Sequence, residues 1–112
     1  MNVSPRWFAA RLLFESRVDD AHTDSLYEER IILVRAGSGT NVARKKAEKV
    51  GAASSHRYEN QTGADVAWLF KEVLDLVQLN DANIGEGTEV YHQYLSAEEV
   101  EHVRQSLKSG SL

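Results

Sequence analysis

Residues 7–16 alternate between two sets of side chains, and this alternation constrains the fold more than any other feature of the chain. Phe8, Ala10, Leu12 and Phe14 form one set, which is wholly apolar, whereas the intervening residues are mixed. A period of two places each set on its own face of a β-strand. We therefore predict a strand over residues 7–16 with one fully apolar face.

A second strand is predicted over residues 27–36, after a polar loop over residues 17–26 that carries Asp19, Asp20 and Asp24. Ile31 to Val34 are consecutive aliphatic residues, a run that is typical of a strand covered on both faces. We expect this strand to lie centrally in its sheet.

A helix is predicted from Val42 to Val50, after the breaker cluster Gly37-Ser38-Gly39. Thr40 or Asn41 would supply the N-cap, and Gly51 suits the left-handed position that ends a helix. The helix face expected to meet the core comprises Val42, Ala43, Ala47 and Val50.

The next segment is ambiguous. Residues 54–59 are typical of a short strand, and Asn60 to Gly63 of a hairpin turn. In residues 64–79 the apolar residues repeat at helical spacing, but Val66, Trp68 and Phe70 also alternate as in a strand. Periodicity alone slightly favours a helix over 64–79.

The C-terminal quarter is predicted to hold a loop over residues 80–87, a strand over residues 88–95 and a helix. Ser96 and Glu99 have the spacing of a capping box, in which each residue bonds the other's backbone amide. The apolar side of this final helix comprises Val100, Val103 and Leu107.

The order of these features resembles a known family. The resemblance covers roughly residues 7–95 and rests on Trp7 to Glu15, Leu26 to Val34, the Ala- and Lys-rich helix, Tyr58-Glu59-Asn60, the series Val66, Trp68, Phe70, Val73 and Asp75, and Gly87 to Tyr91. Taken together, these segments are similar to the small bacterial domain-of-unknown-function family 4288. The resemblance implies a compact α+β domain in which residues 64–79 form an extended strand, and we adopt that strand on its basis. It implies no substrate, cofactor or catalytic residue.

The predicted fold class is therefore α+β: a mostly antiparallel sheet in the order β-β-α-β-β-β-α, with both helices packed on one face. We expect one domain over residues 1–112, with its core within 7–108 and a frayed tail at 109–112. The predicted core comprises Phe8, Leu12, Phe14, Ile32, Val34, Val42, Ala47, Val50, Val100, Val103 and Leu107.

Composition excludes several classes of function. The chain has no cysteine, so disulfides, thiolate zinc sites and iron–sulfur clusters are excluded. A net charge of −4 makes nucleic acid an unfavourable partner. The longest apolar run, Val66 to Phe70, is too short to span a membrane, and Arg11 interrupts the only stretch that resembles a secretory signal. A cytoplasmic protein with no membrane or nucleic-acid partner is expected.

Two Glu-x-x-His pairs, Glu89–His92 and Glu99–His102, match part of a carboxylate-bridged di-iron site. That site needs both pairs on facing helices, whereas the first pair falls on a predicted strand, where positions i and i+3 point to opposite faces. The segment Gly37-Ser38-Gly39-Thr40 matches no phosphate-binding motif. We therefore predict no metal and no cofactor.

The second face of strand 7–16 carries the predicted interface: Trp7, Ala9, Arg11 and Leu13. No remaining segment is apolar enough to cover it, and an apolar patch of this kind usually marks a partner surface. We expect a non-catalytic binding module that forms a homodimer through this face, with Arg11 and Glu15 at or near the contact. Two alternatives stay open: a small enzyme that uses His56, His92 and nearby carboxylates, and an inhibitor or immunity-type partner of another protein.

Overall fold

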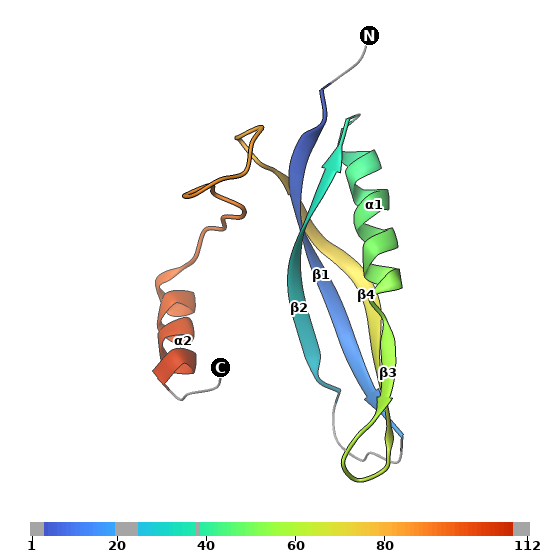
Figure 1. The fold of residues 1–112 in the computed structure, drawn as a ribbon. Helices are drawn as coiled ribbons and strands as arrows, with labels where there is room; N and C mark the ends of the chain where they lie inside the picture. The colour runs from blue at the N-terminus through green and yellow to red at the C-terminus, as the bar shows by residue number, and fades with distance from the viewer. Residues whose placement is uncertain (1–3, 20–24, 38, 109–112) are drawn as a thin grey trace.

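Residues 4–19, 25–37 and 39–108 are described by a computed structural model (Figure 1). The predicted loop residues Asp20 and Asp24, the turn residue Ser38 and the tail 109–112 lie outside these ranges. The elements in chain order are β1 (Arg6–Val18), β2 (Tyr27–Ala36), α1 (Thr40–Ala53), β3 (His56–Glu59), β4 (Asp65–Gln78) and α2 (Ala97–Lys108). The α+β class is confirmed, but residues 88–95 form no strand, so the described order is β-β-α-β-β-α.

The sheet is antiparallel throughout, in the order β2-β1-β4-β3. β1 is its centre and pairs along its length with β2 on one side and β4 on the other. The expectation that residues 27–36 lie centrally is wrong, because β2 is an edge strand. Its aliphatic run faces the core on one side and a second apolar surface on the other, which gives the same pattern as a central position.

The β3–β4 hairpin confirms the predicted turn. The Asn60 side-chain oxygen accepts hydrogen bonds from the backbone amides of Thr62 and Ala64, each at 3.0 Å. Gly63 follows with φ of 84°, a left-handed conformation that glycine adopts without strain. β4 then runs extended, which confirms the strand adopted for residues 64–79 and not the helix that the spacing of its apolar residues favours. Pairing with both β1 and β3 outweighs that spacing.

The core lies between the sheet and α1. Phe8, Leu12 and Phe14 are fully buried, as predicted from the alternation in β1. The Phe14 and Phe70 rings meet edge to face, with their centres 5.7 Å apart. Such a pair stabilises beyond the area that it buries.

α1 meets the sheet through small residues, which corrects the predicted helix face. Its buried residues are Ala43, Ala47 and Gly51. Gly51 is inside the helix, not beyond its end, and a Cβ atom there would lie 2.5 Å from the Phe70 ring. Val42 and Val50 are exposed, because the close approach of helix to sheet leaves room only for small side chains. The helix begins after Gly39, and neither Thr40 nor Asn41 caps it.

α2 does not pack on the sheet, which corrects the prediction that both helices share one face. None of its residues is buried, and it contacts no strand or other helix. It lies apart from the strands, on the β2 side (Figure 1). The predicted core residues Val103 and Leu107 are therefore 48% and 58% exposed. An amphipathic pattern shows that a helix has an apolar side but not which surface that side will cover.

Candidate interaction surface

The four predicted interface residues lie together on the sheet face opposite α1. Phe8, Ala10, Leu12 and Phe14 belong to the core beneath α1, so the intervening residues of β1 point to the other face. We call this second face the open face, because no helix among the described residues packs on it. The larger apolar side chains of the open face, assigned by strand register, are those of Trp7, Leu13, Ile31, Leu33, Leu69 and Val77.

Burial differs among the predicted residues. Ala9 is fully buried, because Leu33 and Val77 flank it across the two neighbouring strands. Trp7 is half-buried, and the Arg35 guanidinium lies 5.8 Å from its ring centre. A small residue enclosed by larger neighbours contributes little contact surface of its own. The open face therefore presents Trp7 and its aliphatic neighbours, with Ala9 as part of the floor.

Arg11 is the centre of a polar cluster on the open face. Its guanidinium donates hydrogen bonds to the Glu29 carboxylate at 2.5 Å and to the Tyr91 hydroxyl at 3.3 Å. That hydroxyl donates to the Asp75 carboxylate at 2.9 Å. We call these four residues the Arg11 cluster. It joins β1, β2 and β4 to the segment that follows β4, and so holds that segment against the open face.

Charge pairing sets the ionisation of the Arg11 cluster. The hydrogen bond to Glu29 raises the pKa of Arg11 above its usual range. Burial and the hydrogen bond to Asp75 both raise the pKa of the Tyr91 hydroxyl above its ordinary value. The Nε atom of Arg11 is buried without a hydrogen-bond partner. Arg11 therefore stays charged, and its charge is balanced within the chain.

The sequence analysis missed Glu29, Asp75 and Tyr91. Asp75 is the direct cross-strand partner of Arg11, a relation that appears only once the register is known. Tyr91 reaches the open face through a side-chain hydroxyl, and no local pattern reports such a contact. Alternation alone therefore finds the face but not the cluster in its centre.

Glu15 is likewise occupied within the chain. Its carboxylate accepts a hydrogen bond from the Tyr27 hydroxyl at 3.0 Å and lies 3.5 Å from the Lys71 amine. The bond from Tyr27 lowers the pKa of Glu15. Arg11 and Glu15 thus each have a partner on the same sheet.

An open cleft of about 470 Å³ lies between the open face and α2. Arg11 lines it from the sheet, and the C-terminal segment contributes Gln93, Leu95, Glu98, Glu99, His102 and Val103. The predicted capping box is present: the Ser96 amide donates to Glu99 Oε1 and the Glu99 amide to Ser96 Oγ, each at 3.1 Å. The hydrogen bond from the Ser96 amide lowers the pKa of the Glu99 carboxyl.

The comparison with known families identifies the domain that carries this surface. The sequence model of the family described as Domain of unknown function (DUF4288) matches residues 7–92. The chain belongs to this family. The match includes all four strands, α1 and Tyr91, whereas α2 lies beyond it. No curated protein and no solved structure matches the chain.

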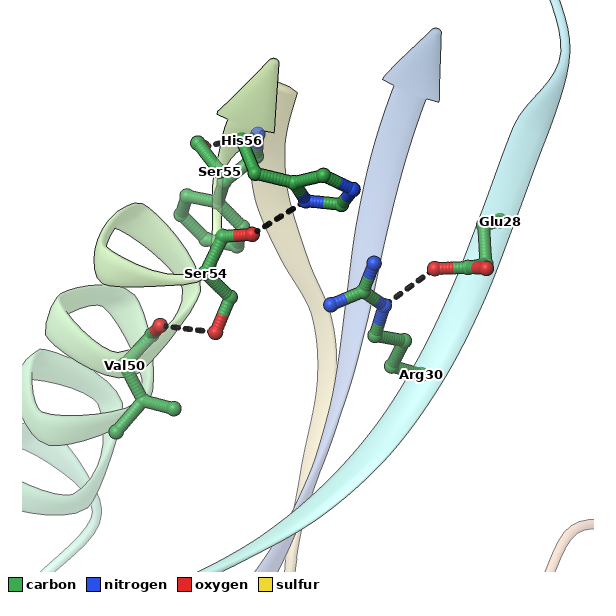
Figure 2. A network of polar contacts seen from close by, with 7 residues as sticks. Glu28, Arg30, Val50, Ser54, Ser55 and His56 are labelled. Atoms are coloured by element: carbon green, nitrogen blue, oxygen red, sulfur yellow. Dashed lines mark hydrogen bonds and ion pairs between the residues drawn. The ribbon is translucent and has the colours of Figure 1, made fainter. Parts of the chain in front are cut away.

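Around the end of α1, the other face of the DUF4288 sheet carries a second set of polar contacts (Figure 2). The Ser54 hydroxyl donates to the Val50 carbonyl at 2.8 Å, and His56 Nδ1 lies 3.2 Å from the Ser54 carbonyl oxygen. Nearby, the Arg30 guanidinium pairs with Glu28 and lies 4.1 Å from the Phe14 ring centre. These contacts end the helix and cover the edge of the core.

The two histidines of the enzyme alternative, His56 and His92, lie in different parts of this DUF4288 chain. His56 is on β3, on the α1 side, whereas His92 follows Tyr91 and contacts Glu89, with 3.3 Å between Nδ1 and Oε1. Within residues 4–19, 25–37 and 39–108, no group of three or more His, Asp or Glu side chains could hold a metal ion. No helix in those ranges is long and apolar enough to cross a membrane.

Proposed function

We propose that this chain is a small cytoplasmic bacterial protein that acts as a non-catalytic binding module and self-associates through the open face. The observation that carries the proposal is the incomplete burial of apolar side chains there: Ile31, at the middle of β2, is 46% exposed, and Trp7 and Leu13 are half-buried. The absence of cysteine agrees with a reducing compartment. The proposed partner is a second copy of the chain; nucleic acid, membrane and cofactor have no part in it.

Apolar side chains on the open face are stabilised when another surface covers them. Burying a large apolar side chain contributes about 1.5–3 kcal/mol. The charges of the Arg11 cluster are paired within the chain, so association through the open face would bury no unpaired charge there. Two-fold dimers are the commonest homo-oligomers, and in them one patch meets its own copy. A largely apolar face whose central charges are paired within the chain suits that arrangement.

Sedimentation velocity at micromolar concentration tests the proposal. We expect a species of about 25 kDa, twice the chain mass of 12.5 kDa. Trp7→Glu should produce a folded monomer, because it places a charge on the open face. Lys45→Glu is the matched control, since it changes charge on the exposed side of α1 and should leave the dimer intact.

A wild-type chain that sediments as a monomer would contradict self-association. If Trp7→Glu then left solubility and stability unchanged, a heterologous protein partner of the inhibitor or immunity type would become the better hypothesis.

A further inference from the structure

α2 packs on no other helix or strand in the described part of its own chain. Its apolar stripe contains Val100, Val103 and Leu107, yet none of its residues is buried. An isolated helix of 12 residues is marginal in water, since helices shorter than about 12–15 residues need tertiary packing. A surface elsewhere must therefore support it.

The dimensions of the chain also indicate that it is less compact than a typical domain of its length. Its radius of gyration is 17.3 Å, whereas a compact domain of this length has about 13 Å. The excess agrees with the position of α2, which lies apart from the sheet on the β2 side (Figure 1). The chain thus leaves two apolar surfaces incompletely covered, the open face and the α2 stripe.

The Arg11 cluster fixes the point at which the C-terminal segment leaves the sheet. The Tyr91 hydroxyl is held over the middle of β1 by Arg11 and over β4 by Asp75. The following segment then leads to α2, which lies apart from the strands (Figure 1). Val103 and Leu95 line the same cleft as Arg11, but the other α2 residues of the lining are Glu98, Glu99 and His102. Only one edge of the apolar stripe therefore borders the cleft, because Val100 and Leu107 do not line it.

We propose that α2 is exchanged between two copies of the chain, so that its Val100, Val103 and Leu107 stripe packs on the open face of the partner. Each chain supplies one helix and one sheet face, and a two-fold axis makes the two contacts identical. Each cleft then receives the α2 helix of the other copy. This inference rests on the proposed self-association and adds the element that mediates it.

Engineered cysteines test the exchange without background, because the natural chain contains none. Ile31→Cys places a thiol on the open face, and Val103→Cys places one on the α2 stripe. The two single variants are mixed at micromolar concentration, refolded together and oxidised, with a tag on one chain to mark its mass. We expect a disulfide-linked product that contains one chain of each kind.

The matched control replaces Ile31→Cys with Lys45→Cys, a thiol on the exposed side of α1. Its mixed product with Val103→Cys should be at least about tenfold less abundant. The double variant Ile31→Cys/Val103→Cys gives the complementary measurement, and exchange predicts covalent dimers in preference to an intrachain disulfide.

The outcomes separate the two proposals. An intrachain disulfide in the double variant, with the chain mass of 12.5 kDa retained, would show that α2 folds back on its own sheet and would overturn the exchange. A wild-type dimer in sedimentation that yields no mixed disulfide would overturn the exchange but keep self-association. A wild-type monomer would overturn both.

Discussion

The two faces of the sheet differ in what covers their apolar residues. On the α1 face the strands contribute large side chains such as Phe14 and Phe70, and the helix contributes only Ala43, Ala47 and Gly51. On the open face the strands also contribute large apolar side chains, but no helix among the described residues covers them. Sheet surfaces of similar character therefore become core or contact surface according to what packs on them.

The comparison also shows which side chains allow a helix to pack closely on a sheet. α1 approaches so closely that the Phe70 ring occupies the space of a Gly51 side chain. The apolar stripe of α2 consists of larger residues. The surface that packs against α2 must therefore leave more room for side chains than the sheet leaves for α1. Close packing needs complementary sizes as well as apolar character.

Removing a large side chain from each face should give the largest difference. Phe14→Ala is expected to lower the free energy of unfolding by about 3–5 kcal/mol, because Phe14 is fully buried and contacts Phe70. Leu13→Ala, at the next position but on the open face, should cost about 1 kcal/mol in the monomer. Urea denaturation followed by circular dichroism measures both. Equal losses would show that the open face is packed as tightly as the core.

Adding a methyl group where α1 meets the sheet should have the next largest effect on stability. Gly51→Ala places a Cβ atom 2.5 Å from the Phe70 ring, and such overpacking costs about 1–3 kcal/mol. Gly85→Ala is the matched control, since nothing lies within 4 Å of its added Cβ atom. Thermal unfolding compares the two. A stable Gly51→Ala variant would mean that α1 sits further from the sheet than described.

Removing the hydrogen bonds that hold the C-terminal segment on the open face should have a smaller effect on stability. Tyr91→Phe removes the hydroxyl that links Arg11 to Asp75 and should cost about 0.5–1.5 kcal/mol. The raised pKa of Tyr91 adds a pH dependence. The neutral hydroxyl favours the folded state, so its contribution is complete below the ordinary value of 10.0 and is lost as pH rises through the raised pKa.

Unfolding measured from about pH 9 to about pH 11 checks this dependence. The wild type should lose more stability over that range than Tyr91→Phe. Tyr27, whose pKa is raised by its bond to Glu15, titrates in both proteins and serves as the internal reference. Parallel curves for the two proteins would rule out a role for the Tyr91 hydroxyl in stability.

Removing the cap of α2 should affect overall stability least. Ser96→Ala deletes the hydroxyl that accepts from the Glu99 amide and should destabilise α2 by about 1 kcal/mol. Because α2 contacts no strand, the monomer should lose helical signal at 222 nm without a shift in the unfolding midpoint of the sheet. A lower midpoint would indicate that α2 is coupled to its own sheet after all.

The parts predicted correctly from sequence are those fixed by short-range rules. The alternation at Phe8 to Phe14, the Asn60 turn and the Ser96–Glu99 capping box are each specified within a few residues. The extended course of residues 64–79 is also confirmed, but it came from the family resemblance, since the local spacing favoured a helix.

The errors concern contacts between distant segments. Helical spacing predicts Val42 and Val50 in the core, but both are exposed, because spacing does not report how closely a helix approaches its sheet. The predicted strand over residues 88–95 is replaced by a segment held through the Tyr91 hydroxyl, a single side-chain contact across the sheet. The interface of Trp7, Ala9, Arg11 and Leu13 remains a prediction, although the structure places all four on one face.

The β1–β4 pairing has a consequence for the order in which the chain folds. The β1–β2 and β3–β4 pairs join neighbours in sequence, whereas even the nearest β1–β4 partners, Val18 and Val66, are far apart along the chain. Because closing so long a loop is entropically costly, we expect the joining of the two hairpins to be the slow step of folding. The register shifts at Arg11/Leu12 and Leu13/Phe14 lie in this seam. Because a slip of one residue would exchange the two faces, these irregularities fix the alignment that decides which side chains α1 will bury.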